Sequence, residues 1–208
     1  MKTDIITVHG DLDGRNEAME AAERFAAYHG IAGKDAMHIR LLTEEAVGMI
    51  DGIMEGFTGK FWVESEKTKK GLLCRICLAA DKQANRAQEA HILSVSSSGK
   101  NENAKGIRGK IRDLFRRSLQ TATEKDEQFL LNMSDALGSP GSRSGSVTQD
   151  ANYWSLQVYR QQIKAKQDDQ PEEWDELEKS IISQLSDDVK VWLSNDSTEL
   201  MIEKTIVC

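Results

Sequence analysis

The sequence is poor in proline, cysteine and aromatic residues. Its 208 residues include 2 prolines, 3 cysteines, 5 phenylalanines, 4 tryptophans and 3 tyrosines. With 39% hydrophobic and 29% charged residues, the composition excludes a disordered chain and a disulfide-rich scaffold, and it favours helix. The length suits one compact domain and excludes two large independent ones. Composition and pattern alone therefore predict a soluble α+β domain.

Long apolar runs are absent. No stretch approaches the roughly 18 apolar residues that a membrane-spanning helix needs. Near the N-terminus, Asp4 interrupts the apolar core that a signal peptide would require. We therefore expect a cytoplasmic protein with no membrane partner.

Positive charge is also in deficit. Lysine and arginine total 27 against 34 aspartates and glutamates, a net charge of −7 that is the wrong sign for coating nucleic acid or an anionic membrane. The segment 105–117 departs from this balance, with six cations in a predicted helix. That helix could contact phosphates, but Phe115, its one aromatic residue, falls on the apolar face. A solvated face, or a patch that docks an acidic protein, is favoured, and we predict no nucleic-acid partner.

Two of the cysteines, Cys74 and Cys77, form a Cys-x-x-Cys motif that invites a zinc or redox interpretation. The surrounding GLLCRICLAA alternates as a strand does, which would point the two thiols to opposite faces. The sequence also lacks a second cysteine pair and a histidine pair at zinc-finger spacing. We therefore interpret both as structural cysteines in a reducing compartment.

The first half of the chain predicts two helices followed by a hairpin. Strong helix formers fill residues 15–29, and Gly30 follows as the terminating residue. Asp35 is predicted to cap a second helix that runs to about Met54 with an apolar stripe at spacings of three and four. FWVESE and GLLCRICLAA then read as an antiparallel hairpin.

The second half predicts a third helix from Lys105, a loop, further helices and a terminal hairpin. Residues 137–150 form a flexible Ser/Gly-rich insertion. Extra helices are expected within 151–186: one carries Tyr153, and another starts at Pro171 and runs past Leu185. VKVWL and ELMIEKTIV then form a second hairpin. We predict a single domain spanning 1–208.

This order of elements resembles the histidine-kinase-type (GHKL) ATP-binding fold and is most similar to the bacterial anti-sigma-factor serine kinases. HIRLLTEEAVGMIDGI is similar to the helix that carries the family's N-box, a Glu-Ala-Val-x-Asn pattern. KFWVESE, LLCRICLAA and ELMIEKTIV are similar to the strands that follow and to the last strand. The resemblance implies an α+β two-layer sandwich, with a mixed, mostly antiparallel sheet covered on one face by helices.

The resemblance assigns a catalytic role to one residue, but this sequence lacks the asparagine that helps to bind Mg²⁺ in the family. Glu45 matches the N-box glutamate, which orients or deprotonates the attacking nucleophile. Four residues later the family has an asparagine that helps to hold Mg²⁺, where this sequence has Met49. A thioether is a soft ligand that suits Mg²⁺ poorly. ATP and Mg²⁺ are thus the implied cofactors, and Met49 argues against Mg²⁺-dependent catalysis.

The remaining nucleotide-site candidates lie in the middle of the chain. By resemblance, Asp81 would read the adenine amino group, although the family's glycines do not follow it. Gly106 and Gly109 match the position of the second glycine box, and Lys105 beside them completes a possible phosphate cradle. No protein metal ligand is assigned. Glu44 and Asp51, about two helical turns apart, could bind a cation in place of the missing asparagine, but a solvated acidic helix face is favoured.

These observations leave two main functional hypotheses. The first is a cytoplasmic regulatory protein with an anti-sigma-factor-kinase-like fold and a degenerate nucleotide site, acting through protein–protein binding. The alternative is an active ATP-dependent serine/threonine kinase of that type. The implied partner is sigma-factor-like or anti-anti-sigma-like, and a homodimer is possible. A DNA-binding regulator that uses the basic helix is a third, less favoured class.

Overall fold

The computed structural model describes residues 1–54, 56–81, 107, 109–111, 153–165, 177, 180–193 and 197–207. Its strands form one six-stranded sheet with the order β1-β2-β3-β6-β5-β4. The strands are β1 (Ile6–His9), β2 (Thr58–Thr68), β3 (Gly71–Asp81), β4 (Tyr153–Ser155), β5 (Asp188–Leu193) and β6 (Ser197–Ile206). The helices described in full are α1 (Leu12–Tyr28), α2 (Gly33–Asp51), α5 (Leu156–Ala165) and α7 (Ile181–Leu185).

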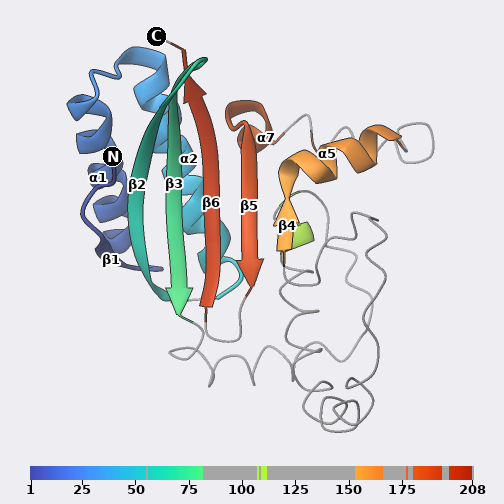
Figure 1. Cartoon of the computed structure of the whole chain (residues 1–208). Coiled ribbons are helices and arrows are strands. Elements are labelled where there is room, and N and C mark those ends of the chain that lie inside the picture. Colours follow the sequence, from blue (N-terminus) through green and yellow to red (C-terminus); the bar gives the residue numbers. More distant parts are fainter. Residues whose placement is uncertain are drawn as a thin grey trace, which may run out of the picture.

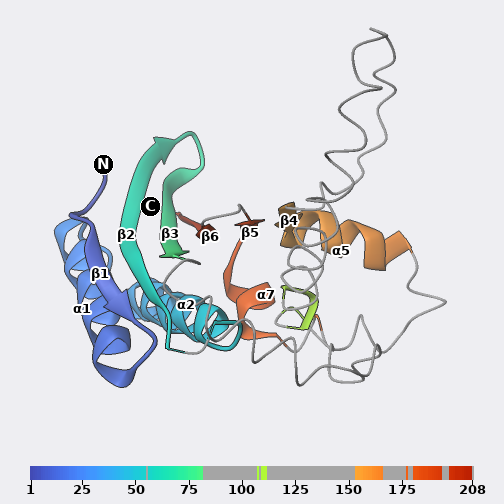
Figure 2. The same cartoon turned by 90° about the horizontal axis from the view of Figure 1, so that it is seen from below.

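The molecule has two layers. Helices α1, α2 and α7 lie against one face of the sheet, and α5 extends from its β4 edge (Figures 1 and 2). This arrangement confirms the α+β class. All five pairings between the described strands are antiparallel, so none of them supplies the parallel pair of a mixed sheet. None of the helices within the described ranges has the length and apolar character needed to cross a bilayer.

The first two helices are found where the sequence predicts them, with one difference in capping. Helix α1 begins after Asp11, whose carboxylate accepts a hydrogen bond from the Gly14 amide, and Gly30 follows it with φ +67°. The prediction that Asp35 caps the second helix is wrong. Helix α2 begins at Gly33, and Asp35 lies in its first turn, where a carboxylate still benefits from the helix dipole.

The first hairpin is confirmed, and so is the separation of its two thiols. On β3, Cys74 faces the helices together with Ile76 and Leu78, whereas Cys77 faces the other side of the sheet. Both cysteines are free and buried. Burial raises the pKa of the Cys77 thiol to about 12, which keeps it protonated and therefore unreactive near neutral pH.

The C-terminal part confirms the terminal hairpin of β5 and β6 but corrects two helix predictions. The sequence pattern predicts a helix at Tyr153, but this residue lies in β4, paired with Trp192 of β5, and the helix begins three residues later, at Leu156. The helix predicted to run through Leu185 is interrupted at Ser180, whose backbone is extended and whose hydroxyl accepts from the Ser183 amide. Pro171 and the Ser/Gly-rich segment 137–150 lie outside the described residues.

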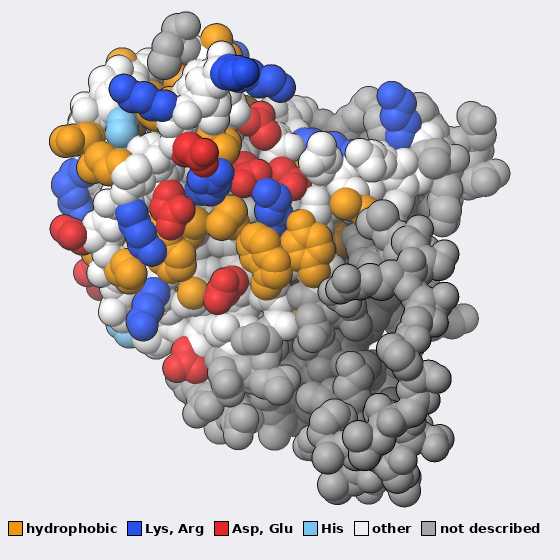
Figure 3. Space-filling view, viewed as in Figure 1, with side chains coloured by type: hydrophobic (Ala, Val, Ile, Leu, Met, Phe, Trp, Pro, Cys, Tyr) orange, Lys and Arg blue, Asp and Glu red, His pale blue; other side chains and the backbone are white. Residues whose placement is uncertain are grey.

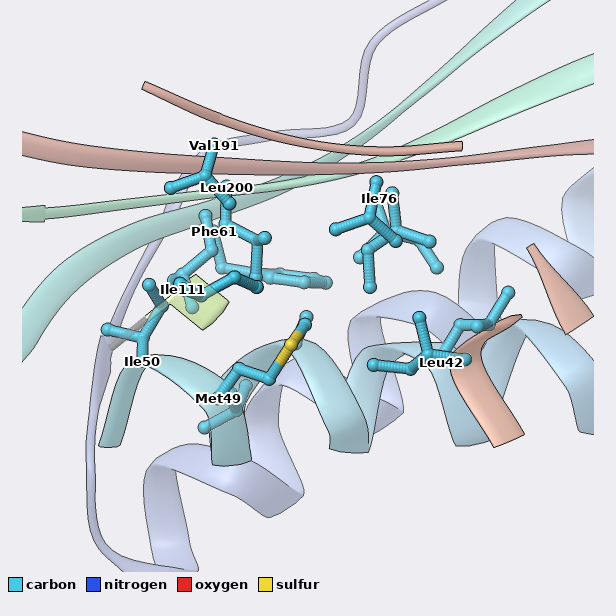
Figure 4. Packing of buried hydrophobic residues seen from close by; sticks show 14 of the residues in the cluster. Leu42, Met49, Ile50, Phe61, Ile76, Ile111, Val191 and Leu200 are labelled. Atoms are coloured by element: carbon cyan, nitrogen blue, oxygen red, sulfur yellow. The ribbon is translucent and has the colours of Figure 1, made fainter. Parts of the chain in front are cut away.

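The core fills the space between the sheet and the helices. Alternate residues of the strands point toward α1 and α2, because side chains alternate between the two faces of a strand. Phe61, Ile76 and Leu200 meet Leu42, Met49 and Ile50 of α2 in one cluster (Figure 4). Ile111 joins the same cluster, so this central segment of the chain packs onto the core.

Candidate functional site

Helix α2 carries Glu45 and Met49, the two residues that the resemblance matches to the N-box, and the structure gives them different environments. Glu45 is half-buried. Met49, one turn later, is 2% exposed and belongs to the core. Figure 4 shows its side chain directed from α2 toward the strands, near Phe61. A residue at this position therefore packs against the sheet, where its side chain is shielded from solvent.

The described part of the segment predicted to be a second glycine box, Ile107 and residues 109–111, lies close to α2. Gly109 is helical and buried, and its neighbours Ile107 and Ile111 lie in the same hydrophobic cluster as Met49 and Ile50. Figure 4 places Ile111 beside Ile50. The contact between the two predicted motifs is thus apolar. Lys105 and Gly106 lie outside the described residues.

Asp81, the predicted adenine-reading residue, is exposed at the end of β3. Its Cα partner is Ser197, the first residue of β6. Alternation along β3 groups Asp81 with Arg75 and Cys77, on the face of the sheet opposite α2. The pleat of β3 therefore separates Asp81 from the face against which Glu45 and Met49 lie.

Glu44 and Asp51, considered above as a cation site in place of the asparagine, also lie in different environments. Glu44 is exposed, whereas Asp51 pairs with Arg15 of α1 at 2.7 Å and accepts a hydrogen bond from the Gly56 amide. Asp51 is packed so closely that a Cβ atom on Gly10 would lie 2.4 Å from its Oδ1. Asp51 thus ties α1 to the end of α2. The described residues include no group of three or more His, Cys, Asp or Glu side chains that could hold a metal ion.

Sequence reasoning missed one polar residue of interest, Thr198. It is fully buried near the start of β6, between Ala80 of β3 and Leu193 of β5. Within the described ranges its hydroxyl has no hydrogen-bond partner, which is uncommon for a buried polar group. Alternation with Leu200 and Ile202 could have indicated that Thr198 faces the core. Only the register of the sheet brings it next to the end of β3.

The described residues also line an open hollow of about 570 Å³ at the start of α1. Its described lining includes two carboxylates, Asp11 and Asp13, together with Gly10, Leu12 and Arg15. Neither Glu45 nor Asp81 contributes to it. The hollow is therefore distinct from these two residues, which the resemblance assigns to a nucleotide.

Comparison with known proteins gives no assignment. The chain matches no protein-family model, no curated protein and no solved structure.

Proposed function

We propose that this chain is a regulatory protein that acts through protein–protein binding, on an anti-sigma-factor-kinase-like fold whose nucleotide site is degenerate. The order of its described elements supports the fold: a strand, two helices, a hairpin and a terminal hairpin in one sheet, with helices on one face. The GHKL resemblance implies this order of elements and helices on one face, together with a parallel strand pair that the described strands do not supply.

Met49 carries the proposal. An N-box asparagine holds Mg²⁺ through a hard carbonyl oxygen, and Met49 offers a soft thioether at that position. The thioether is buried in the core at 2% exposure. Met49 thus contributes packing energy in place of a metal ligand. The position of Asp81 on the other face of the sheet agrees with a site that has lost its adenine-reading residue.

The alternative, an active ATP-dependent serine/threonine kinase, is favoured by Glu45 alone. Glu45 is half-buried on α2, in the helix that Gly109 and Ile111 approach. A carboxylate there could accept a proton from an attacking hydroxyl. Without a magnesium ligand one turn away, that carboxylate lacks the charge neutralisation that phosphoryl transfer requires.

Calorimetric titration with ATP and Mg²⁺, combined with an assay of phosphate release, separates the two functions. We expect no phosphate release, and any ATP binding should be the same with and without Mg²⁺. The informative variant is Met49→Asn, which restores the family's asparagine, and its packing control is Met49→Leu.

An ATPase or kinase activity of the wild-type chain that is lost in Glu45→Gln would overturn the proposal and establish the alternative. Activity that persists in Glu45→Gln would indicate a contaminating enzyme and leave the chain itself without activity, as proposed.

A further inference from the structure

The face of the sheet that α1, α2 and α7 leave open has two unlike halves. One half is a charge ladder formed by Glu66, Arg75, Glu203 and Lys190. Arg75 contacts Glu66 at 2.7 Å and Glu203 at 3.2 Å, and Lys190 contacts Glu203 at 2.8 Å. Each charge in the ladder has an opposite partner within the molecule. This half is therefore a self-neutralised, solvated sheet surface.

The other half is an aromatic shelf, defined by Trp62, Met201, Glu199, Trp192 and Tyr153. All but Glu199 are half-buried, and the rings of Trp192 and Tyr153 lie 5.5 Å apart. Figure 3 shows hydrophobic side chains gathered on this face over β5 and β4. Adjacent half-exposed aromatic side chains are characteristic of protein interfaces and uncommon on a solvated sheet face.

One carboxylate on the shelf differs from those of the ladder. Glu199 is exposed and lies directly opposite Trp192 in the register of β5 and β6. Among the described residues it forms no ion pair, while Glu203, four residues later on the same strand, contacts both Arg75 and Lys190. Within the described part of the chain, the shelf therefore presents a carboxylate without an ion-pair partner beside an aromatic ring.

At the edge of the same face, another tryptophan and another glutamate hold a cation of the chain itself. The ammonium group of Lys2 lies 4.2 Å from the centroid of the Trp62 ring and 3.7 Å from the Glu64 carboxylate. Trp62 and Glu64 thus hold a cation between an aromatic face and an acid, an arrangement that combines cation–π and Coulombic attraction. Trp192 and Glu199 present the same two chemical groups outward.

We propose that the aromatic shelf is a docking surface for a basic segment of a partner protein, in which arginine or lysine alternates with apolar residues. Apolar side chains would cover Trp192, Tyr153 and Met201, and a cation would pair with Glu199. A second copy of this chain is the competing occupant, and the oligomeric state in solution distinguishes it from a partner segment. The proposal deepens the proposed function, on which it rests for the existence of a partner protein.

The test measures binding of a labelled peptide of alternating arginine and leucine by fluorescence anisotropy and calorimetry, at two salt concentrations. We expect saturable binding that weakens at high salt, and no binding of the matched glutamate–leucine peptide. Glu199→Lys should weaken binding by about tenfold, the loss expected for reversing a charge at a contact.

Glu17→Lys is the matched control, because Glu17 is an exposed glutamate on α1 and its replacement changes the net charge equally. It should change affinity by less than about twofold. Trp192→Ala should also weaken binding, and if that variant does not fold, Trp192→Phe should retain it. The docking surface is refuted if the wild-type chain fails to bind the basic peptide, or if Glu17→Lys weakens binding as much as Glu199→Lys.

Two further measurements distinguish failure of the docking surface from failure of the proposed function. Sedimentation showing a wild-type dimer that Glu199→Lys dissociates would replace the partner segment with a second copy and overturn the inference. Phosphoryl transfer by the wild-type chain would overturn the proposed function and leave the peptide result standing. If the wild-type chain neither binds the basic peptide nor shows enzyme activity, only the docking surface is refuted and the proposed function stands.

Discussion

The two faces of the sheet are built from alternate residues of the same strands, yet they differ in composition and in packing. Phe61 and Val63 of β2 point into the core, and Trp62 and Glu64 between them point to the open face. The core face is almost entirely apolar, whereas the open face combines ion pairs with aromatic rings. The comparison shows that strand alternation sets the direction of each side chain, and that the covering helices set how much of it is buried.

The two cysteines of β3 refine this comparison. Cys74 faces the helices and Cys77 faces the open side, and each is almost fully buried. In the sheet register Cys77 lies between Trp62 of β2 and Met201 of β6, two larger side chains on the same face. Large neighbours can therefore bury a small residue on a face that no described helix covers.

The largest expected effect comes from a pair of substitutions on adjacent residues. Phe61→Ala should lower the free energy of unfolding by about 3–5 kcal/mol, because a fully buried phenylalanine leaves a cavity. Trp62→Ala should cost about 1–2 kcal/mol, because that ring is only half-buried. Urea denaturation of both variants measures the difference. Equal losses would show that the open face is packed as tightly as the core.

Next in size is the effect of an asparagine at position 49, where the resemblance predicts one. Met49→Asn should destabilise the protein by about 2–4 kcal/mol, because it places an amide in an apolar cluster. Met49→Leu, which conserves volume, should cost less than about 1.5 kcal/mol. Thermal and urea unfolding compare the two. If Met49→Asn is as stable as Met49→Leu, the amide reaches water or a polar partner, and the position is available to a ligand.

A smaller effect is expected in the charge ladder. Arg75 is 24% exposed and contacts two carboxylates, so Arg75→Ala should cost about 1 kcal/mol and less in 1 M NaCl, where charge interactions are screened. Arg24→Ala, which breaks an exposed pair with Glu20 on α1, is the control and should cost less than about 0.5 kcal/mol. Urea titrations at low and high salt distinguish them. A salt-independent loss would mean that Arg75 acts through packing.

The smallest expected effect is a dependence of stability on pH at the helix-covered face. Burial, with nearby positive charge from the N-terminal amine and Lys67, lowers the pKa of His29 below its ordinary 6.5. The unfolded chain therefore binds the proton more readily, and stability should fall as the pH drops from about 6.5 toward the lower folded pKa. In urea unfolding at pH 7.5 and 5.5, His29→Gln should lose less stability than the wild type.

His38, whose pKa burial also lowers, remains in the His29→Gln variant, so the pH dependence should shrink without vanishing. An unchanged dependence in that variant would assign the effect to His38 or to other groups.

Local patterns predicted most of the described elements. Gly30 marked the end of α1, and the alternation around Cys74 and Cys77 predicted both the hairpin and the opposite directions of the thiols. The errors lie where a pattern is short or ambiguous. Tyr153 has helical spacing to Leu156, but pairing with β5 draws it into a strand, and Ser180 interrupts a helix whose apolar periodicity continues through it.

The candidate site was less predictable than the fold. A motif gives the spacing between residues along a helix, so Glu45 and Met49 could be placed one turn apart on α2. It does not give the face of the sheet on which a distant residue ends. The placement of Asp81 on the open face and the burial of Thr198 beside β3 both depend on the register of strands far apart in sequence.

The sequence by itself determined the α+β class, the two N-terminal helices and both hairpins, because these follow from composition and from periodicities over a few residues. Only the tertiary structure decided that Met49 packs in the core, that Asp51 pairs with Arg15 and that Glu199, which forms no ion pair among the described residues, lies beside Trp192. Burial and pairing are properties of neighbours, and the neighbours of these residues come from strands and helices that only folding brings together.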